Sequence, residues 1–172
     1  RKIDILFPAQ GGGEALKSAM DSLFEKAERH ISDGANILVM TDRHITKDRC
    51  AIPSLLAVSG LHHHLIRKGL RSSCGLILET GEAREVMHFS LLVAFGITAI
   101  CPYVAFSTVR EMAEQEYLVE KKDPEEATDA YISAVKKGLL KSFSRMGIST
   151  IRSFFGSQIF EAVGIDKSVI NE

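Results

Sequence analysis

The sequence contains no tryptophan, few prolines and only three cysteines, and it has no excess of charge of either sign. Its 21 basic and 22 acidic residues leave a net charge of −1, so neither nucleic acid nor an anionic membrane is indicated as a partner. No apolar run approaches the ~18 residues that a membrane-spanning helix needs. The 172 residues are 45% hydrophobic, which predicts one globular domain or one domain with a short extension.

The three cysteines, Cys50, Cys74 and Cys101, are odd in number and widely spaced. No pair of them has the C-x-x-C spacing of a metal-binding or redox motif. We therefore expect buried free thiols in a reducing cytoplasm, and no metal or other cofactor bound within this chain.

Short apolar segments alternate with longer segments of helical periodicity over the first hundred residues. Strands are predicted at 3–7, 36–41, 74–78 and 97–101, and helices at 14–32, 53–68 and 85–95. Strands separated by helices form right-handed βαβ crossovers and a parallel sheet. The fold class is therefore α/β, built of βα units, either partially TIM-barrel-like or an open doubly wound sheet. The continuous apolar character of 36–41 is typical of a strand covered on both faces.

The composition changes after Phe106. Residues 111–126 carry many charges and few apolar side chains, which predicts a surface helix followed by a connector. Within them, Asp123-Pro124-Glu125-Glu126 supplies an N-cap, a proline in the first turn and a capping-box glutamate for a long helix that ends before Gly147. Residues 148–151 are predicted as one more strand, and 157–163 as a final short helix.

Charged residues follow two of the predicted parallel strands, at the points where these strands end. They are Asp42, Arg43, Glu79, Glu82 and Arg84. Ligands of α/β proteins bind at this edge of the sheet, so the two loops form a candidate ligand or interdomain site. The opposite charges could instead pair with one another and hold the loops, an interpretation we favour somewhat.

Two further motifs have simpler explanations than a binding site. Gly11-Gly12-Gly13 lies between a strand and a helix but lacks the lysine of a P-loop, which favours a flexible turn over a phosphate cradle. His62, His63 and His64 point about 100° apart on a helix and cannot converge on one metal ion. We interpret them as a polar cluster at the end of a helix.

Longer motifs resemble the glutamate synthases over nearly the whole chain. They comprise residues 79–104, Val39-Met40-Thr41-Asp42-Arg43, residues 60–67, Met146-Gly147-Ile148-Ser149-Thr150, Ser153, Gly156 and Gln158-Ile159-Phe160-Glu161. The sequence departs from the family pattern at Phe154, Phe155 and Ser157, where tyrosine, arginine or cysteine, and alanine are usual.

The resemblance implies a piece of an enzyme that makes L-glutamate. Such enzymes release ammonia from glutamine, pass it through a tunnel to 2-oxoglutarate and reduce the imine with FMN, and they carry an iron–sulfur cluster. Residues 1–118 would be the C-terminal part of the central domain, and 119–172 a connector helix and the start of the FMN-binding barrel. Ser153 and Gln158 become candidate flavin contacts. The catalytic cysteine and the cluster ligands would lie outside this chain, and either ferredoxin or NAD(P)H fits as electron donor.

The leading hypothesis is a glutamate synthase fragment with a structural, interdomain role and no catalytic residue of its own. Its partners would be the other domains of the parent enzyme, and the start at Arg1, without an initiator methionine, is interpreted as a cut inside a longer polypeptide. One alternative is a free-standing βα ligand-binding or regulatory module, and another is an independent phosphate-binding barrel enzyme. Open sheet edges in such a fragment also predict self-association.

Overall fold

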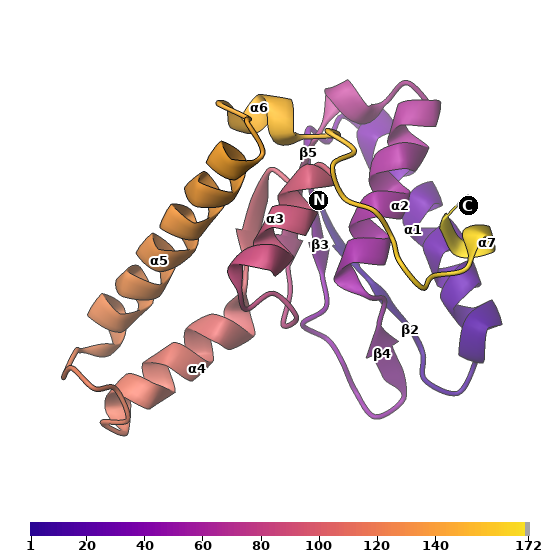
Figure 1. Cartoon of the computed structure of the whole chain (residues 1–172). Helices are drawn as coiled ribbons and strands as arrows, with labels where there is room; N and C mark the ends of the chain where they lie inside the picture. Colours follow the sequence, from indigo (N-terminus) through magenta and orange to yellow (C-terminus); the bar gives the residue numbers. More distant parts are fainter. Residues whose placement is uncertain (171–172) are drawn as a thin grey trace.

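A parallel sheet of four strands runs through the middle of the molecule in the computed structural model, which describes residues 1–170 (Figure 1). Its strands are β1 (Lys2–Asp4), β3 (Ile37–Thr41), β5 (Gly75–Glu79) and β6 (Ala99–Cys101), in the order β1-β3-β5-β6. The connecting helices are α1 (Gly12–Ser32), α2 (Ser54–Arg67) and α3 (Val86–Ala94). The predicted α/β class is confirmed, and the described sheet is open.

The four strands cross the sheet in the order in which they occur in the sequence. Right-handed crossovers between strands in this order place all connecting helices on one face of the sheet. Contacts of α1 with α2, and of α2 with α3, agree with a single helical layer. The same strand order occurs in a βα barrel, but here the four strands do not close, and β1 and β6 are the edges of the sheet.

Burial alternates along the two central strands. Leu38, Met40 and Leu76 are fully buried under the helical layer. Ile37 is 47% exposed, and Ile77 is only partly buried. Since successive side chains point to opposite faces of a strand, the face away from the helices leaves these apolar side chains partly open, with Lys2 and Asp4 of β1 beside them. The expectation that strand 36–41 is covered on both faces is therefore wrong for this chain, which covers one.

The first predicted strand is divided between two sheets. After β1, the chain turns at the buried Ile5 into β2 (Leu6–Pro8), which pairs antiparallel with β4 (Arg49–Ala51). The Ile5 N–H donates to the Thr41 carbonyl and its own carbonyl accepts from Ile52, both at 2.9 Å, so this residue joins the two sheets. Neither the division nor β4 was predicted, because Arg49-Cys50-Ala51 has no strand-like alternation.

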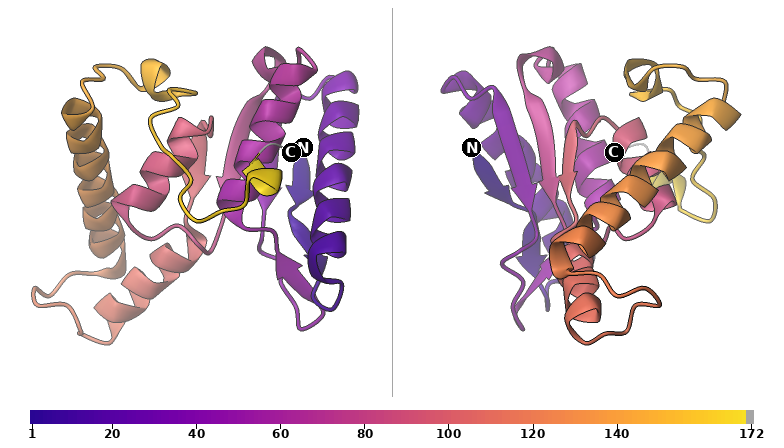
Figure 2. Two further views of the ribbon diagram at one scale, coloured as in Figure 1. Left: turned by 45° about the vertical axis from the view of Figure 1, so that its right-hand side comes forward. Right: turned by 90° about the vertical axis from the view of Figure 1, so that its left-hand side faces the viewer.

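Two further helices form a hairpin beside the sheet (Figure 2). They are α4 (Tyr103–Glu114) and α5 (Pro124–Arg145), and α5 packs against both α4 and α3. The predicted capping box is confirmed. The Asp123 carboxylate accepts a hydrogen bond from the Glu126 N–H at 2.8 Å, and the Glu126 carboxylate accepts one from the Asp123 N–H. The charge-rich stretch from residue 111 contains only the last turn of α4, which begins at Tyr103, eight residues before the predicted surface helix.

The C-terminal segment differs most from prediction. Residues 148–150 have no partner strand, and Thr150 instead caps the one-turn helix α6 (Ile151–Phe154). Left-handed backbone at Gly156 and Gln158 then prevents the predicted helix at 157–163, which is irregular. The chain then passes α2, and the last described element is the short helix α7 (Lys167–Ile170) (Figure 1). None of the described helices is both long enough and apolar enough to cross a membrane.

Arg71, a partly buried residue of the turn η1 (Arg71–Ser73), connects this turn to α2 and to the glycine that follows α3. Arg71 Nε donates to His62 Nδ1 at 3.0 Å, and its guanidinium also donates to the carbonyls of Cys74 at 2.8 Å and Gly96 at 2.6 Å. Burial, together with this guanidinium, lowers the pKa of His62 to about 4, so the ring stays neutral and can accept the bond at pH 7.

The ends of α1 and α3 provide a matched test of this packing. Gly34 and Gly96 follow these helices in left-handed conformation, with φ of +86° and +97°. A Cβ would enter open space at Gly34 but would collide with the His62 ring at Gly96. We expect Gly34→Ala to cost about 1 kcal/mol and Gly96→Ala about 3 kcal/mol or more. Urea unfolding of both variants measures the difference, and equal costs would contradict the packing of His62.

Candidate functional site

A buried carboxylate lies where β3 and β5 end. Asp42 is only 1% exposed and accepts a hydrogen bond from Thr80 Oγ1 at 2.8 Å and one from the Gly81 N–H at 2.9 Å. A buried charge is costly unless it is paired or hydrogen-bonded, and here two donors come from the loop after β5. The Asp42 carboxylate thereby joins the two loops in which the sequence placed a site.

The same loop also reaches the start of α2. Because Thr80 gives its proton to Asp42, its oxygen accepts from Ser54 Oγ at 2.7 Å and from the Glu82 N–H at 3.0 Å. The Glu82 carboxylate in turn accepts from the Ser54 N–H at 2.8 Å. A carboxylate at a helix N-terminus satisfies a free N–H group and complements the helix dipole. Glu82 therefore caps α2 from another part of the chain.

The outer half of the cluster is an ion-pair network. Glu79 Oε2 lies 2.8 Å from Lys2 Nζ and 3.6 Å from Arg43 Nε. The hydrogen bond from Lys2 is the main cause that lowers the pKa of Glu79, and the Arg43 charge adds to it. Lys2 thus connects the end of β5 to β1, two strands away in the sheet.

Tyr103, at the start of α4, closes the cluster from the side of β6. The Arg43 guanidinium lies 4.1 Å from the centre of its ring, in cation–π geometry. Burial, followed by the hydrogen bond to Asp42, raises the pKa of Tyr103 to about 12, so the phenol keeps its proton as a donor. Among the described residues, Arg43 and Glu79 are the one pair of opposite charges between the two loops, whereas Asp42 and Glu82 accept hydrogen bonds from uncharged groups.

Four of the five predicted loop residues enter this cluster, and one does not. Arg84 contributes only backbone contacts within the described residues: its N–H donates to His88 Nδ1 at 3.2 Å, and its carbonyl accepts from Tyr131 Oη at 2.8 Å. Sequence reasoning missed Ser54, Thr80 and Tyr103. Thr80 follows a strand, whereas Ser54 and Tyr103 begin helices, and no local sequence signal shows that the three come together.

Ser153 and Gln158, the predicted flavin contacts, lie in the C-terminal segment. The Ser153 hydroxyl is 3.0 Å from Thr150 Oγ1, within a helix cap. Gln158 borders a shallow hollow of about 230 Å³ whose wall includes His62 and Phe160. A flavin phosphate needs several N–H groups or cations converging on it. These two residues do not form such a site by themselves, so their role as flavin contacts stays a prediction that requires groups from elsewhere.

The remaining motifs do not converge on a ligand. The three histidines make separate hydrogen bonds. His63 Nδ1 bonds to the Ser59 carbonyl at 2.9 Å, His64 Nε2 bonds to Glu28 at 2.6 Å, and His62 Nδ1 accepts from Arg71. In residues 1–170, no group of three or more His, Cys, Asp or Glu side chains is arranged to hold a metal ion.

The burial of the cysteines and the position of the triple glycine do not indicate a binding site either. All three cysteines are free, but only Cys74 is buried, whereas Cys101 is partly buried and Cys50 is exposed. The prediction of buried thiols is therefore wrong for Cys50, which lies on the two-stranded ribbon of β2 and β4. Gly11 is the N-cap of α1, and Gly12 and Gly13 lie in its first turn.

Removing the charge of Asp42 tests whether the loops depend on it. We expect Asp42→Asn to lower the free energy of unfolding by about 2 kcal/mol. The amide oxygen can replace Oδ2, but the two bonds there lose their charge assistance, and the NH2 group faces the Gly81 N–H, which lies 3.2 Å from Oδ1. Asp4→Asn is the control, because Asp4 makes an exposed hydrogen bond of 2.8 Å to His44 and is expected to cost no more than about 0.5 kcal/mol. Urea unfolding at pH 7 measures both, and a neutral Asp42→Asn would contradict the cluster.

Comparison with known proteins places this fold in a family. Residues 1–166 match the family model described as glutamate synthase central domain. The chain is 44% identical over 171 residues to the glutamate synthase (NADPH) large chain of Bacillus subtilis, and 40% identical over 176 residues to the glutamate synthase (NADH) of Saccharomyces cerevisiae. It is 39% identical over 180 residues to the ferredoxin-dependent glutamate synthase of Pyropia yezoensis.

Each of these alignments covers 99% of this chain but only 11%, 8% and 12% of the respective relative. The chain therefore spans about a tenth of the length of these curated relatives. The resemblance noted in the sequence motifs is confirmed: the chain belongs to the glutamate synthase central domain family.

Proposed function

We propose that this chain is a structural, interdomain part of a glutamate synthase. The complete enzyme would make L-glutamate from glutamine and 2-oxoglutarate by ammonia channelling and FMN-dependent reduction, as an oxidoreductase acting on CH–NH2 donors in the cytoplasm. The observation that carries the proposal is the similarity along 99% of the chain to three glutamate synthases that differ in the electron donor their names give.

The packing of the sheet supports an interdomain role. The face away from the helices carries Ile37, Val39 and Ile77, which are exposed or only partly buried. Apolar surface of this kind is stabilised when another layer covers it. In the complete enzyme we propose that other domains supply that layer. In the chain alone the same face, together with the free edges of β1 and β6, would favour self-association.

The polar edge of the sheet supports a structural rather than a catalytic role. Asp42 and Glu82 are bonded to loop and helix N–H groups, and Glu79 is paired with Lys2. We propose that these residues order the loops that face neighbouring domains. Other parts of the complete enzyme would hold FMN and the iron–sulfur cluster. Ser153 and Gln158 would contribute contacts to the flavin only. We keep a division near residue 118 as part of the proposal, with α5 as the connector helix.

The test compares the full-length protein with residues 1–172 alone. We expect the full-length protein to contain FMN and to form glutamate from glutamine and 2-oxoglutarate when an electron donor is supplied. The isolated chain should show no glutamate formation and no FMN absorbance after incubation and gel filtration. Glutamate formation by the isolated chain would contradict the proposal, and so would a full-length protein that lacks this activity with every electron donor.

A further inference from the structure

The turn between α4 and α5 carries three consecutive apolar side chains, of which two are exposed. This connector turn, residues 115–123, carries Tyr117, Leu118 and Val119. The Tyr117 side chain is 71% exposed, Val119 is fully exposed, and Leu118 is partly buried. The turn lies at the end of the helical hairpin, away from α1 and α2 (Figure 2). None of the three belongs to the core clusters of the described residues.

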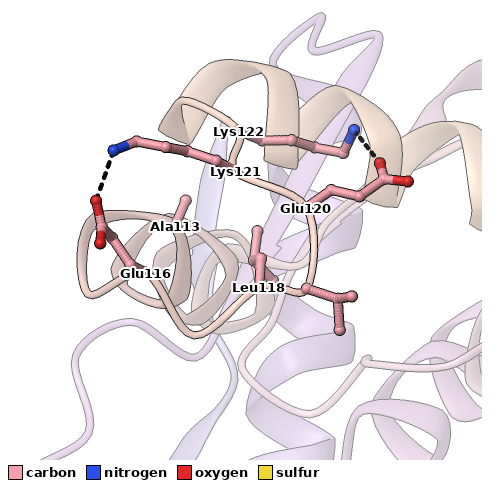
Figure 3. A pocket seen from close by; sticks show the side chains of 7 residues that line it. Ala113, Glu116, Leu118, Glu120, Lys121 and Lys122 are labelled. Atoms are coloured by element: carbon pink, nitrogen blue, oxygen red, sulfur yellow. Dashed lines mark hydrogen bonds and ion pairs between the residues drawn. The ribbon is translucent and has the colours of Figure 1, made fainter.

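The connector turn is held in a defined conformation. Glu116 has a φ of +56°, and the Tyr117 N–H donates to the Met112 carbonyl at 2.9 Å. Ion pairs join Lys121 to Glu116 at 2.7 Å and Lys122 to Glu120 at 3.0 Å (Figure 3). Because the capping box of α5 fixes the end of the turn as well, the apolar side chains stay in water instead of folding back.

The shape and charge around the connector turn indicate which kind of partner surface it would bind. A hollow of about 190 Å³ lies beside the apolar side chains, lined by Ala113, Leu118, Val119 and the paired Glu and Lys side chains. Residues 110–126 contain seven carboxylates and three basic side chains, so the rim is acidic. Electrostatic complementarity then favours a partner surface with an apolar pocket and basic residues around it.

The size of the apolar surface decides between kinds of partner. Three side chains bury roughly 400 Å² at most, about half of what one partner of a stable stand-alone complex buries. Such a contact is too small for free molecules but sufficient within one polypeptide, where tethering gives an effective concentration in the mM range. A second copy of the chain is therefore disfavoured as the occupant of this turn.

We propose that the connector turn docks into an apolar pocket flanked by Lys or Arg on another domain of the same polypeptide. Tyr117 and Val119 enter the pocket, and the acidic rim pairs with the basic residues. The inference rests on the proposed function in one respect, namely that the chain is part of a longer glutamate synthase.

The test uses the full-length protein with Val119→Cys, which keeps a small apolar side chain at the tip. Labelling at residue 119 by N-ethylmaleimide is followed by peptide mass spectrometry in native protein and in urea. We expect native labelling to be at least about tenfold slower than labelling of the unfolded chain. Adding Tyr117→Ser should restore much of the labelling rate, because it removes an apolar side chain that enters the pocket. Raising the salt to 1 M should do the same, because it screens the acidic residues around the turn.

Two results would overturn the proposal. One is native labelling at the rate of the unfolded chain, which means that the turn lies in water. The other is protection that disappears on dilution, which means that a second molecule covers it. Glutamate formation is assayed on the same samples: activity with an unprotected turn rejects only the docking, and a protected turn in an inactive protein rejects only the proposed function.

Discussion

The arrangement of the sheet edge depends on a single buried carboxylate, that of Asp42. A charge in this position must be fully hydrogen-bonded, and the donors come from Thr80 and Gly81 in a loop almost forty residues away. That requirement fixes the loop, which in turn brings Glu82 to the first turn of α2 at Ser54. The sheet, one helix and two loops are thus connected by hydrogen bonds that start from one side chain.

The exposed apolar surfaces of the sheet and of the helical hairpin agree with our proposal that this chain is part of a larger protein. Helices seal one face of the sheet and leave Ile37 and Ile77 on the other face, while the hairpin of α4 and α5 displays Tyr117 and Val119. Burial on one side and apolar exposure on two others is expected of a segment whose neighbours lie elsewhere in the polypeptide. The relatives are about ten times as long as this chain, which is the length that our proposal of neighbouring domains requires.

Elements with strong local signals were predictable from the sequence, and elements that depend on tertiary contacts were not. The α5 start at Asp123 was predictable because capping, proline placement and periodicity all agree there. The strand β4 was not, since Arg49-Cys50-Ala51 is a strand only because β2 lies beside it. The charged half of the candidate site followed from strand ends in the sequence. Thr80 and Tyr103 did not, because their contacts depend on how the loops fold back.

Hydrogen exchange of the backbone amides in the loops tests the central claim most directly. The Gly81 N–H donates to Asp42 and the Ser54 N–H to Glu82, although neither amide belongs to a strand or to the hydrogen-bonded interior of a helix. If the cluster holds the sheet edge together, both amides exchange within about tenfold of the rate of the buried Leu78 in β5. Exchange as fast as that of Lys47 in the exposed turn before β4 would contradict the account.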